Sequence, residues 1–147
     1  MATEEATQTQ IEAFAQGVFD AQPFSRFLGA DLRAVSATSA EIHIRNRTDL
    51  QQQHGFVHGG VISYLADNAL TFAGGLALGG DALTVEYKIN YAKPATGDTI
   101  IARAETLVTT RRQAVCQCSI YALEAGSEHL VAVAQGTIVV AGRELNE

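Results

Sequence analysis

The segment from His54 to Asp67 holds the residue types that could do chemistry in this chain. It places His58, Gly59 and Gly60 at the start of a strongly apolar stretch, and one carboxylate, Asp67, follows nine positions after His58. A carboxylate in an apolar helix is costly to desolvate, so it requires a partner, a shifted pKa or a function. Backbone N–H groups at a helix start carry partial positive charge and can hold a carbonyl oxygen as it becomes an oxyanion. The pattern therefore predicts an acid and an oxyanion donor at a helix.

The helix that carries these residues is expected to run from Gly60 to about Leu78. Apolar residues cover most of its circumference, which is typical of a helix surrounded by protein. Its one polar strip consists of Ser63, Asp67 and Thr71 at a spacing of four, and this strip must face something other than an apolar core. Residues 61–80 approach the length of a membrane span, but their polar side chains and four glycines favour a buried helix. No membrane partner is therefore expected.

Upstream of this helix, Thr9 and Glu12 fit a capping box for a short amphipathic helix over residues 10–21, which Pro23 ends. The alternating residues 41–45 predict a strand. A polar loop is then expected to connect this strand to the long helix.

Downstream of the helix, four alternating runs predict strands separated by turns over residues 83–91, 99–107, 113–123 and 130–140. The first is expected to present Leu83, Val85, Tyr87, Ile89 and Tyr91 on one face. No long crossover separates these strands, so the sheet should be antiparallel. One long helix against one antiparallel sheet is an α+β architecture.

Composition narrows the class of protein. The chain has 147 residues, 47% of them hydrophobic, and is expected to form one domain over 1–147 with an N-terminal helical segment over 1–22. Its net charge of −6 argues against a nucleic-acid or anionic-membrane partner, although a local basic cluster could still bind a phosphorylated ligand. Cys116 and Cys118 are poorly placed to bond each other and are expected to be reduced, as in a cytoplasmic protein. The first residues do not have the pattern of a signal peptide.

Four motifs span nearly the whole chain: Pro23-Phe24-x3-Leu28-Gly29, Gln52-x2-Gly55-x2-His58-Gly59-Gly60-x4-Leu65-Ala66-Asp67, Thr84-x-Glu86-x3-Asn90-Tyr91-x2-Pro94 and Ala134-x-Gly136-Thr137. In these motifs the chain resembles the hotdog-fold thioesterases of the 4-hydroxybenzoyl-CoA thioesterase-like superfamily. More narrowly, it resembles their phenylacetic-acid-degradation (PaaI) type. The resemblance implies a curved antiparallel sheet wrapped around one long central helix.

The resemblance also implies hydrolysis of an acyl-CoA thioester, with roles for five residues. Asp67 would be the nucleophile or the general base on water. The Gly59 N–H would polarise the thioester carbonyl, which His58 would help to position. Gln52 and Thr84 would orient the water or the carboxylate, with Gln52 standing where many relatives have asparagine. Coenzyme A would be part of the substrate, and neither a cofactor nor a metal is expected.

The helical spacing predicts an oligomer independently of the resemblance. Nine helical residues span roughly 13 Å and two and a half turns, so Asp67 and the corner at His58 and Gly59 should lie on opposite sides of the helix. If they cooperate, a two-fold homodimer must bring Asp67 of one subunit to Gly59 of the other. The resemblance implies such dimers, often paired into homotetramers.

Coenzyme A phosphates require local positive charge in this acidic protein. Arg111 and Arg112, after Thr110 at the head of a predicted strand, are the best candidates, and Lys93 is the next. Because adjacent strand residues face opposite ways, only one arginine of the pair is expected to reach the ligand. Gly60 is expected to contribute to the same substrate site.

Two other classes of function remain open at this stage. A lyase of the same architecture would hydrate or dehydrate an acyl thioester, typically with a paired histidine and carboxylate. A non-catalytic protein would bind acyl-CoA without turning it over. The acyl group is not determined by the sequence, although Phe56, Tyr64, Phe72 and Leu76 could line a pocket for an aromatic or medium-chain group.

Overall fold

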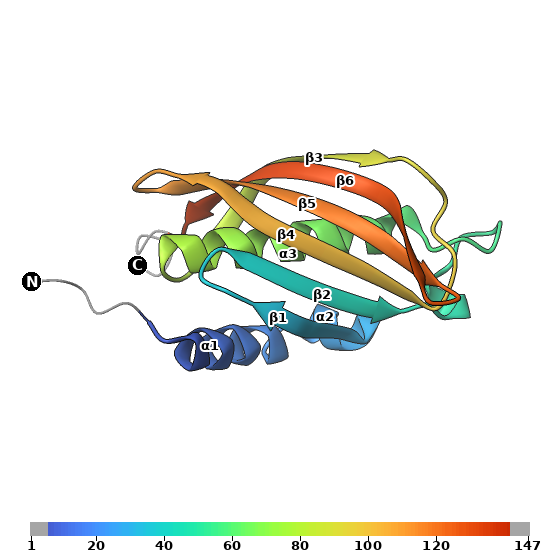
Figure 1. The fold of residues 1–147 in the computed structure, drawn as a ribbon, viewed down its shortest axis with the longest axis horizontal. Helices are drawn as coiled ribbons and strands as arrows, with labels where there is room; N and C mark the ends of the chain where they lie inside the picture. The colour runs from blue at the N-terminus through green and yellow to red at the C-terminus, as the bar shows by residue number, and fades with distance from the viewer. Residues whose placement is uncertain (1–5, 142–147) are drawn as a thin grey trace, which may run out of the picture.

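A computed structural model describes residues 6–141 as a six-stranded antiparallel sheet curved around one long helix (Figure 1). The elements in chain order are α1 (Gln8–Asp20), α2 (Pro23–Leu28), β1 (Ala30–Val35), β2 (Ser39–Arg45), a 3₁₀ turn η1 (Thr48–Leu50), α3 (Gly59–Leu78), β3 (Ala82–Tyr91), β4 (Thr99–Thr109), β5 (Gln113–Glu124) and β6 (Ser127–Val140). The strand order in the sheet is β1-β2-β4-β5-β6-β3, and every neighbouring pair is antiparallel. The predicted α+β hotdog architecture is confirmed.

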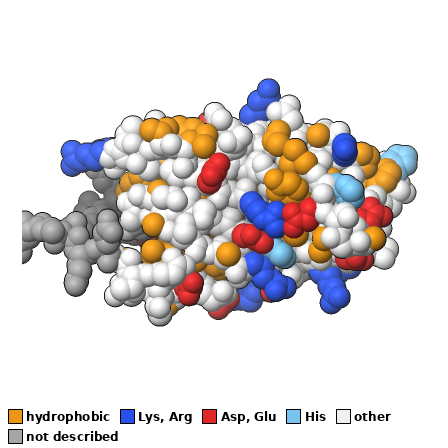
Figure 2. Space-filling view, viewed as in Figure 1, with side chains coloured by type: hydrophobic (Ala, Val, Ile, Leu, Met, Phe, Trp, Pro, Cys, Tyr) orange, Lys and Arg blue, Asp and Glu red, His pale blue; other side chains and the backbone are white. Residues whose placement is uncertain are grey.

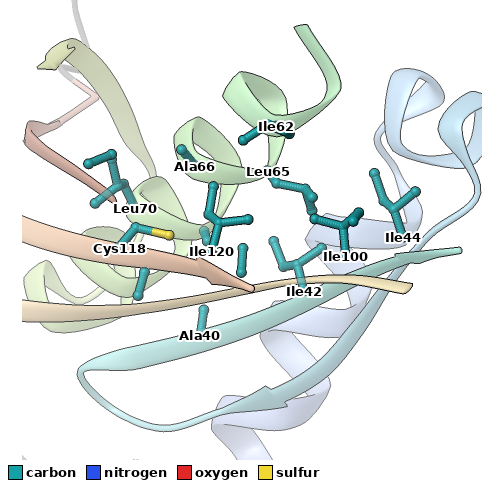
Figure 3. Packing of buried hydrophobic residues seen from close by; sticks show 14 of the residues in the cluster. Ala40, Ile42, Ile44, Ile62, Leu65, Ala66, Leu70, Ile100, Cys118 and Ile120 are labelled. Carbon is teal, nitrogen blue, oxygen red and sulfur yellow. The ribbon is translucent and has the colours of Figure 1, made fainter. Parts of the chain in front are cut away.

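The core lies between α3 and the concave face of the sheet. Leu65, Ala66 and Leu70 on the helix are fully buried, and they point toward the strands in Figure 3. Fully buried isoleucines on the strands, including Ile42 and Ile120, complete the packing. Within residues 6–141, α3 is the one helix long and apolar enough to cross a membrane, but 61% of its apolar window is buried inside the protein. It is the central helix of the fold, as the sequence predicts.

The N-terminal helix differs from expectation in its boundaries. The capping box is formed by Thr7 and Gln10 rather than by Thr9 and Glu12: the Thr7 hydroxyl accepts from the Gln10 backbone N–H, and the Gln10 side chain accepts from the Thr7 backbone N–H. Gln satisfies the same reciprocal geometry as Glu. Pro23 does not end α1 but begins a second short helix, α2, which the sequence pattern did not predict. Proline suits a first helical position because its missing N–H has no helical acceptor there.

The first strand after α3 has a bulge that changes which residues face the helix. The pairing of β3 with β6 shifts register between Thr84 and Glu86, so Val85 has no counterpart on β6. One extra residue reverses the alternation of side chains. Leu83 and Val85 are consequently exposed, whereas Thr84 turns inward. The predicted single face of alternate residues over 83–91 is therefore wrong for its first half.

A close helix–sheet contact at Gly74 predicts a stability effect. A Cβ added there would lie 2.7 Å from the Cβ of Ile138, which is fully buried on β6. We expect Gly74→Ala to lower the free energy of unfolding by about 1–3 kcal/mol, because the buried isoleucine cannot move away without strain.

Urea titration followed by circular dichroism measures this change. Gly17→Ala on α1 is the matched control, since nothing lies within 4 Å of its added Cβ. It should raise stability by about 0.4–1 kcal/mol, as alanine does in an open helical position. A Gly74→Ala protein as stable as the unmodified chain would contradict the packing argument.

Candidate active site

The polar strip of α3 faces the edge strand β3, which supplies hydroxyl groups to it. Three hydrogen-bonded pairs follow one another along the antiparallel helix and strand: Tyr91 with Gly59, Tyr87 with Ser63, and Thr84 with Asp67. Gly59 and Asp67 therefore lie on the same side of α3, and the expectation that they face opposite ways is wrong. They remain separated by eight residues, roughly 12 Å, along the helix axis.

The Asp67 carboxylate is half-buried and held on one side by strand β3. The Thr84 hydroxyl donates to its Oδ1 at 2.7 Å. Thr71, one turn further along the helix, donates to the Asp67 backbone carbonyl at 2.7 Å and also contacts the Thr84 hydroxyl. Among residues 6–141 nothing else hydrogen-bonds to the carboxylate, so Oδ2 is left to accept from a further group. The bulge at Val85 produces this geometry by turning Thr84 inward.

At the start of α3 the histidine acts as the helix cap. His58 Nδ1 accepts from the Gly60 backbone N–H at 2.8 Å, so the neutral ring carries its proton on Nε2. Gly60 is therefore not available as an oxyanion donor while this cap is in place. Within the described part of the chain the Gly59 N–H makes no hydrogen bond, and its residue is partly exposed. A helix N-terminus with one unpaired N–H is suited to stabilise developing negative charge.

A surface groove of about 420 Å³ lies beside this helix start. It is lined on one side by Gln52 and Gly59 and on the other by Tyr91 and Lys93. The Gln52 side-chain Oε1 accepts from the His54 backbone N–H, which fixes the side-chain amide in the loop. The structure thus brings Gln52, Gly59 and Lys93 together, at a different place from Asp67 and Thr84.

Thr110, Arg111 and Arg112 lie at a third place. They form the exposed turn between β4 and β5, where the Thr110 N–H donates to Gln113 and the Arg112 carbonyl accepts from Val140. The arginines are in a turn rather than on a strand, so the expected alternation between them does not apply. Val140 pairs with Ala82 at the start of β3, which places this turn at the Thr84 end of the sheet and away from Gly59.

A partly buried hydrogen-bond network on α3 near Asp67 was not predicted from the sequence. The Tyr64 hydroxyl contacts the buried Ser25 hydroxyl and accepts from the Asn68 amide at 3.1 Å, and Asn68 in turn donates to Gln22. Burial raises the pKa of Tyr64 above its ordinary value, so the phenol stays protonated. The spacing of Tyr64 and Asn68 is the signal that could have indicated this network. It attaches α2 to the face of α3 next to the candidate acid.

The cysteines are free and buried, as expected. Burial raises the pKa of the Cys118 thiol to about 12 and raises that of Cys116 as well. A protonated thiol is a poor nucleophile, so neither cysteine is a candidate nucleophile.

Charged side chains on the convex face of the sheet pair with each other. Arg103 bonds to Glu41 at 3.1 Å and to Glu128 at 2.7 Å, and its guanidinium lies over the Tyr121 ring. The bonds to Glu128 raise the pKa of Arg103. On the face in Figure 2, basic and acidic side chains lie next to each other and do not gather into one basic patch.

Comparisons with known proteins agree with this fold. The model of the Thioesterase superfamily matches residues 54–129. A thioesterase family protein from Silicibacter pomeroyi is 30% identical, with 90% of this chain and 99% of that chain covered and a TM-score of 0.85. A point mutant of the phenylacetic acid degradation protein PaaI of Thermus thermophilus is 27% identical over 82% of this chain and 100% of that one, with a TM-score of 0.72. The fold of Escherichia coli PaaI is also similar, at 20% identity over 93% and 97% of the two chains and a TM-score of 0.81. No curated protein sequence matches.

The fold and its relatives define a thioester hydrolase with the hotdog architecture of the PaaI type. The chain belongs to the Thioesterase superfamily.

The hydrogen bond from Thr84 to Asp67 predicts a measurable effect. We expect Thr84→Val to lower kcat by about 10-fold, because an isosteric side chain removes the hydroxyl that orients the carboxylate. Thr84→Ser, which keeps the hydroxyl, is the control and should retain most of the activity. Steady-state thiol release measures both, and equal activity of Thr84→Val and the unmodified protein would remove Thr84 from the site.

Proposed function

We propose that this protein hydrolyses the thioester of an acyl-CoA, releasing the free acid and coenzyme A. Asp67 acts either as a general base that takes a proton from the attacking water or as a nucleophile that forms an anhydride which water then opens. In both routes the acyl carbon gains the oxygen of a water molecule and the C–S bond breaks. The departing thiolate takes up the proton that this water gives up. The reaction requires no cofactor, since coenzyme A is part of the substrate.

The observation that carries this proposal is that α3 presents both an oriented carboxylate and a backbone N–H without a hydrogen-bond partner among the described residues. Thr84 occupies one oxygen of the Asp67 carboxylate, which leaves the other for water or substrate. His58 holds the Gly60 N–H, while the Gly59 N–H is the donor left for the carbonyl oxygen. Gln52 lines the groove beside Gly59, and His58 is the residue before Gly59, so both are proposed to help position the substrate.

The two halves of the site are about 12 Å apart in one chain, so we infer that they meet across a homodimer. Strand β3 supports this inference because it is an edge strand with exposed apolar side chains at Leu83 and Val85. An exposed edge strand with apolar side chains is usually shielded from solvent by another part of the protein or by a second chain. A two-fold partner on β3 would run its own α3 antiparallel to this one, so that Asp67 of one subunit faces Gly59 of the other. We propose further that two such dimers pair to form a homotetramer.

Positive side chains at the two ends of β3 are suited to the phosphates of coenzyme A. Arg111 and Arg112, with the Thr110 hydroxyl, are exposed at one end, and Lys93 lines the groove with Gly59 at the other. A cytoplasmic location is part of the same proposal, because both cysteines are free, as is usual in a reducing compartment.

A panel of acyl-CoA thioesters with a thiol-reactive dye tests the activity. The proposal predicts release of one thiol for each acyl-CoA consumed. A change in enoyl absorbance without thiol would indicate a hydratase or dehydratase, and tight binding without either signal would indicate a non-catalytic acyl-CoA-binding protein.

A further inference from the structure

The last two turns of α3 form one wall of a small apolar pocket of about 100 Å³. Phe72 and Leu76 come from α3, and Phe14 and Val18 come from α1, which lies beside this half of the helix (Figure 1). Phe14 and Val18 keep 48% and 37% of their surface exposed, which is high for side chains whose neighbours on α1 are buried. The pocket separates α1 from the start of β3.

The pocket continues the polar strip that carries the candidate acid. Positions 67, 71 and 75 follow one another at a spacing of four along α3, so Gly75 is the next position after Thr71 on the strip. Gly75 lines the pocket together with Phe72 and Leu76. Thr71 belongs to both places, because it lines the pocket while its hydroxyl contacts the Thr84 hydroxyl that holds Asp67.

The side of the pocket formed by α3 and the start of β3 is fixed by packing. Phe72 is 7% exposed, and its ring lies 5.9 Å from the ring of Phe19 on the buried side of α1. An added Cβ at Gly75 would come within 3.2 Å of Ala82, so the wall opposite the aromatic rings is also close. The α3 side of the pocket is therefore preformed, while Phe14 and Val18 on the α1 side stay partly exposed.

We propose that this pocket binds the distal carbons of a linear aliphatic acyl chain whose thioester lies at Asp67. This inference rests on the proposed acyl-CoA hydrolysis and names the acyl class. The walls are mainly apolar, with Gln22, Thr71 and Asp81 as their polar members. The pocket begins one helical turn, about 5.4 Å, beyond the acid. Its volume is below the roughly 150 Å³ of an apolar cavity that accepts benzene, so an aliphatic tail fits better than an aryl ring.

Measuring kcat/KM for a series of acyl-CoA substrates of increasing chain length tests this proposal. For the unmodified protein we expect kcat/KM to rise about fourfold for each methylene that enters the pocket, and hence by at least tenfold from butanoyl-CoA to hexanoyl-CoA. Benzoyl-CoA should be a poorer substrate than hexanoyl-CoA.

Val18→Phe should abolish this rise by filling the pocket, while activity with acetyl-CoA stays within twofold. Leu76→Ala should move the preferred chain to a longer acyl group, because it widens the same space. Leu130→Phe is the matched control, since Leu130 is 42% exposed on β6 and does not line the pocket. Its chain-length profile should equal that of the unmodified protein.

A binding measurement separates this inference from the hydrolysis on which it rests. Calorimetry with Asp67→Asn compares hexanoyl-CoA with acetyl-CoA, with and without Val18→Phe. Tighter binding of hexanoyl-CoA that Val18→Phe removes supports the pocket even if no thiol is released in the kinetic assay. Equal binding of the two thioesters, or a chain-length profile that neither Val18→Phe nor Leu76→Ala alters, would overturn the pocket while leaving hydrolysis standing.

Discussion

Replacing Asp67 with asparagine is expected to lower kcat for acyl-CoA hydrolysis by about 10²- to 10⁴-fold, the range for loss of a general base or nucleophile. Asparagine keeps the size of the side chain and can still accept from the Thr84 hydroxyl through its amide oxygen. The change therefore removes the basic oxygen and leaves the neighbouring hydrogen bond in place. Substrate binding should be nearly unchanged, since the amide occupies the same space.

Thiol release under single-turnover conditions measures the chemical step directly. Asp98→Asn is the matched control, because Asp98 is an exposed aspartate in the turn before β4. Its kcat should equal that of the unmodified protein. Full turnover by Asp67→Asn would show that another group activates the water, and the proposed mechanism would then be wrong.

The central helix could be predicted because its signals are local. The apolar run from Gly60 to Leu78 and the polar spacing of Ser63, Asp67 and Thr71 all follow from 3.6 residues per turn, and the observed helix differs by one residue at its start. The strand runs after the helix were found for the same reason, and antiparallel pairing followed from their short connections.

The direction of side chains on β3 could not be predicted, because a bulge depends on the partner strand. Leu83, Val85 and Tyr87 alternate without interruption in the sequence, and the register shift is set where β3 pairs with β6. That shift decides whether Thr84 reaches Asp67. The same limit explains the network from Tyr64 to Ser25 and Gln22, since those residues come from elements far apart in the chain.

The relation of Gly59 to Asp67 was predicted correctly in one respect and wrongly in another. Their separation along α3 follows from the rise per residue. Their direction around the axis was taken from His58, which caps the helix from outside its first turn. The contact of Tyr91 with Gly59 and the contact of Thr84 with Asp67 place both residues on the β3 side.

Replacing Gly59 with proline should lower kcat by about 10²- to 10³-fold, because it deletes the N–H proposed to stabilise the oxyanion. Gly59 is the first residue of α3, the position at which proline is best tolerated. His58 before it has φ −60° and ψ 137°, an extended conformation that proline also favours in its predecessor. Gly59→Ala keeps the N–H and is the control, since its Cβ would meet the Tyr91 ring at an ordinary 3.5 Å.

Combining the two inactive variants distinguishes a shared site from a site within one chain. In a mixed dimer of one Asp67→Asn subunit and one Gly59→Pro subunit, one of the two interfacial sites carries both changes and the other carries neither. Mixed dimers isolated with two different affinity tags should therefore recover about half of the unmodified activity. If Asp67 and Gly59 acted within the same chain, every site in the mixed dimer would carry one of the two substitutions. The mixed dimer would then be as inactive as either single variant. Recovery on mixing thus requires that the acid of one subunit serves the amide of its neighbour, which is the arrangement that we propose from their separation along α3.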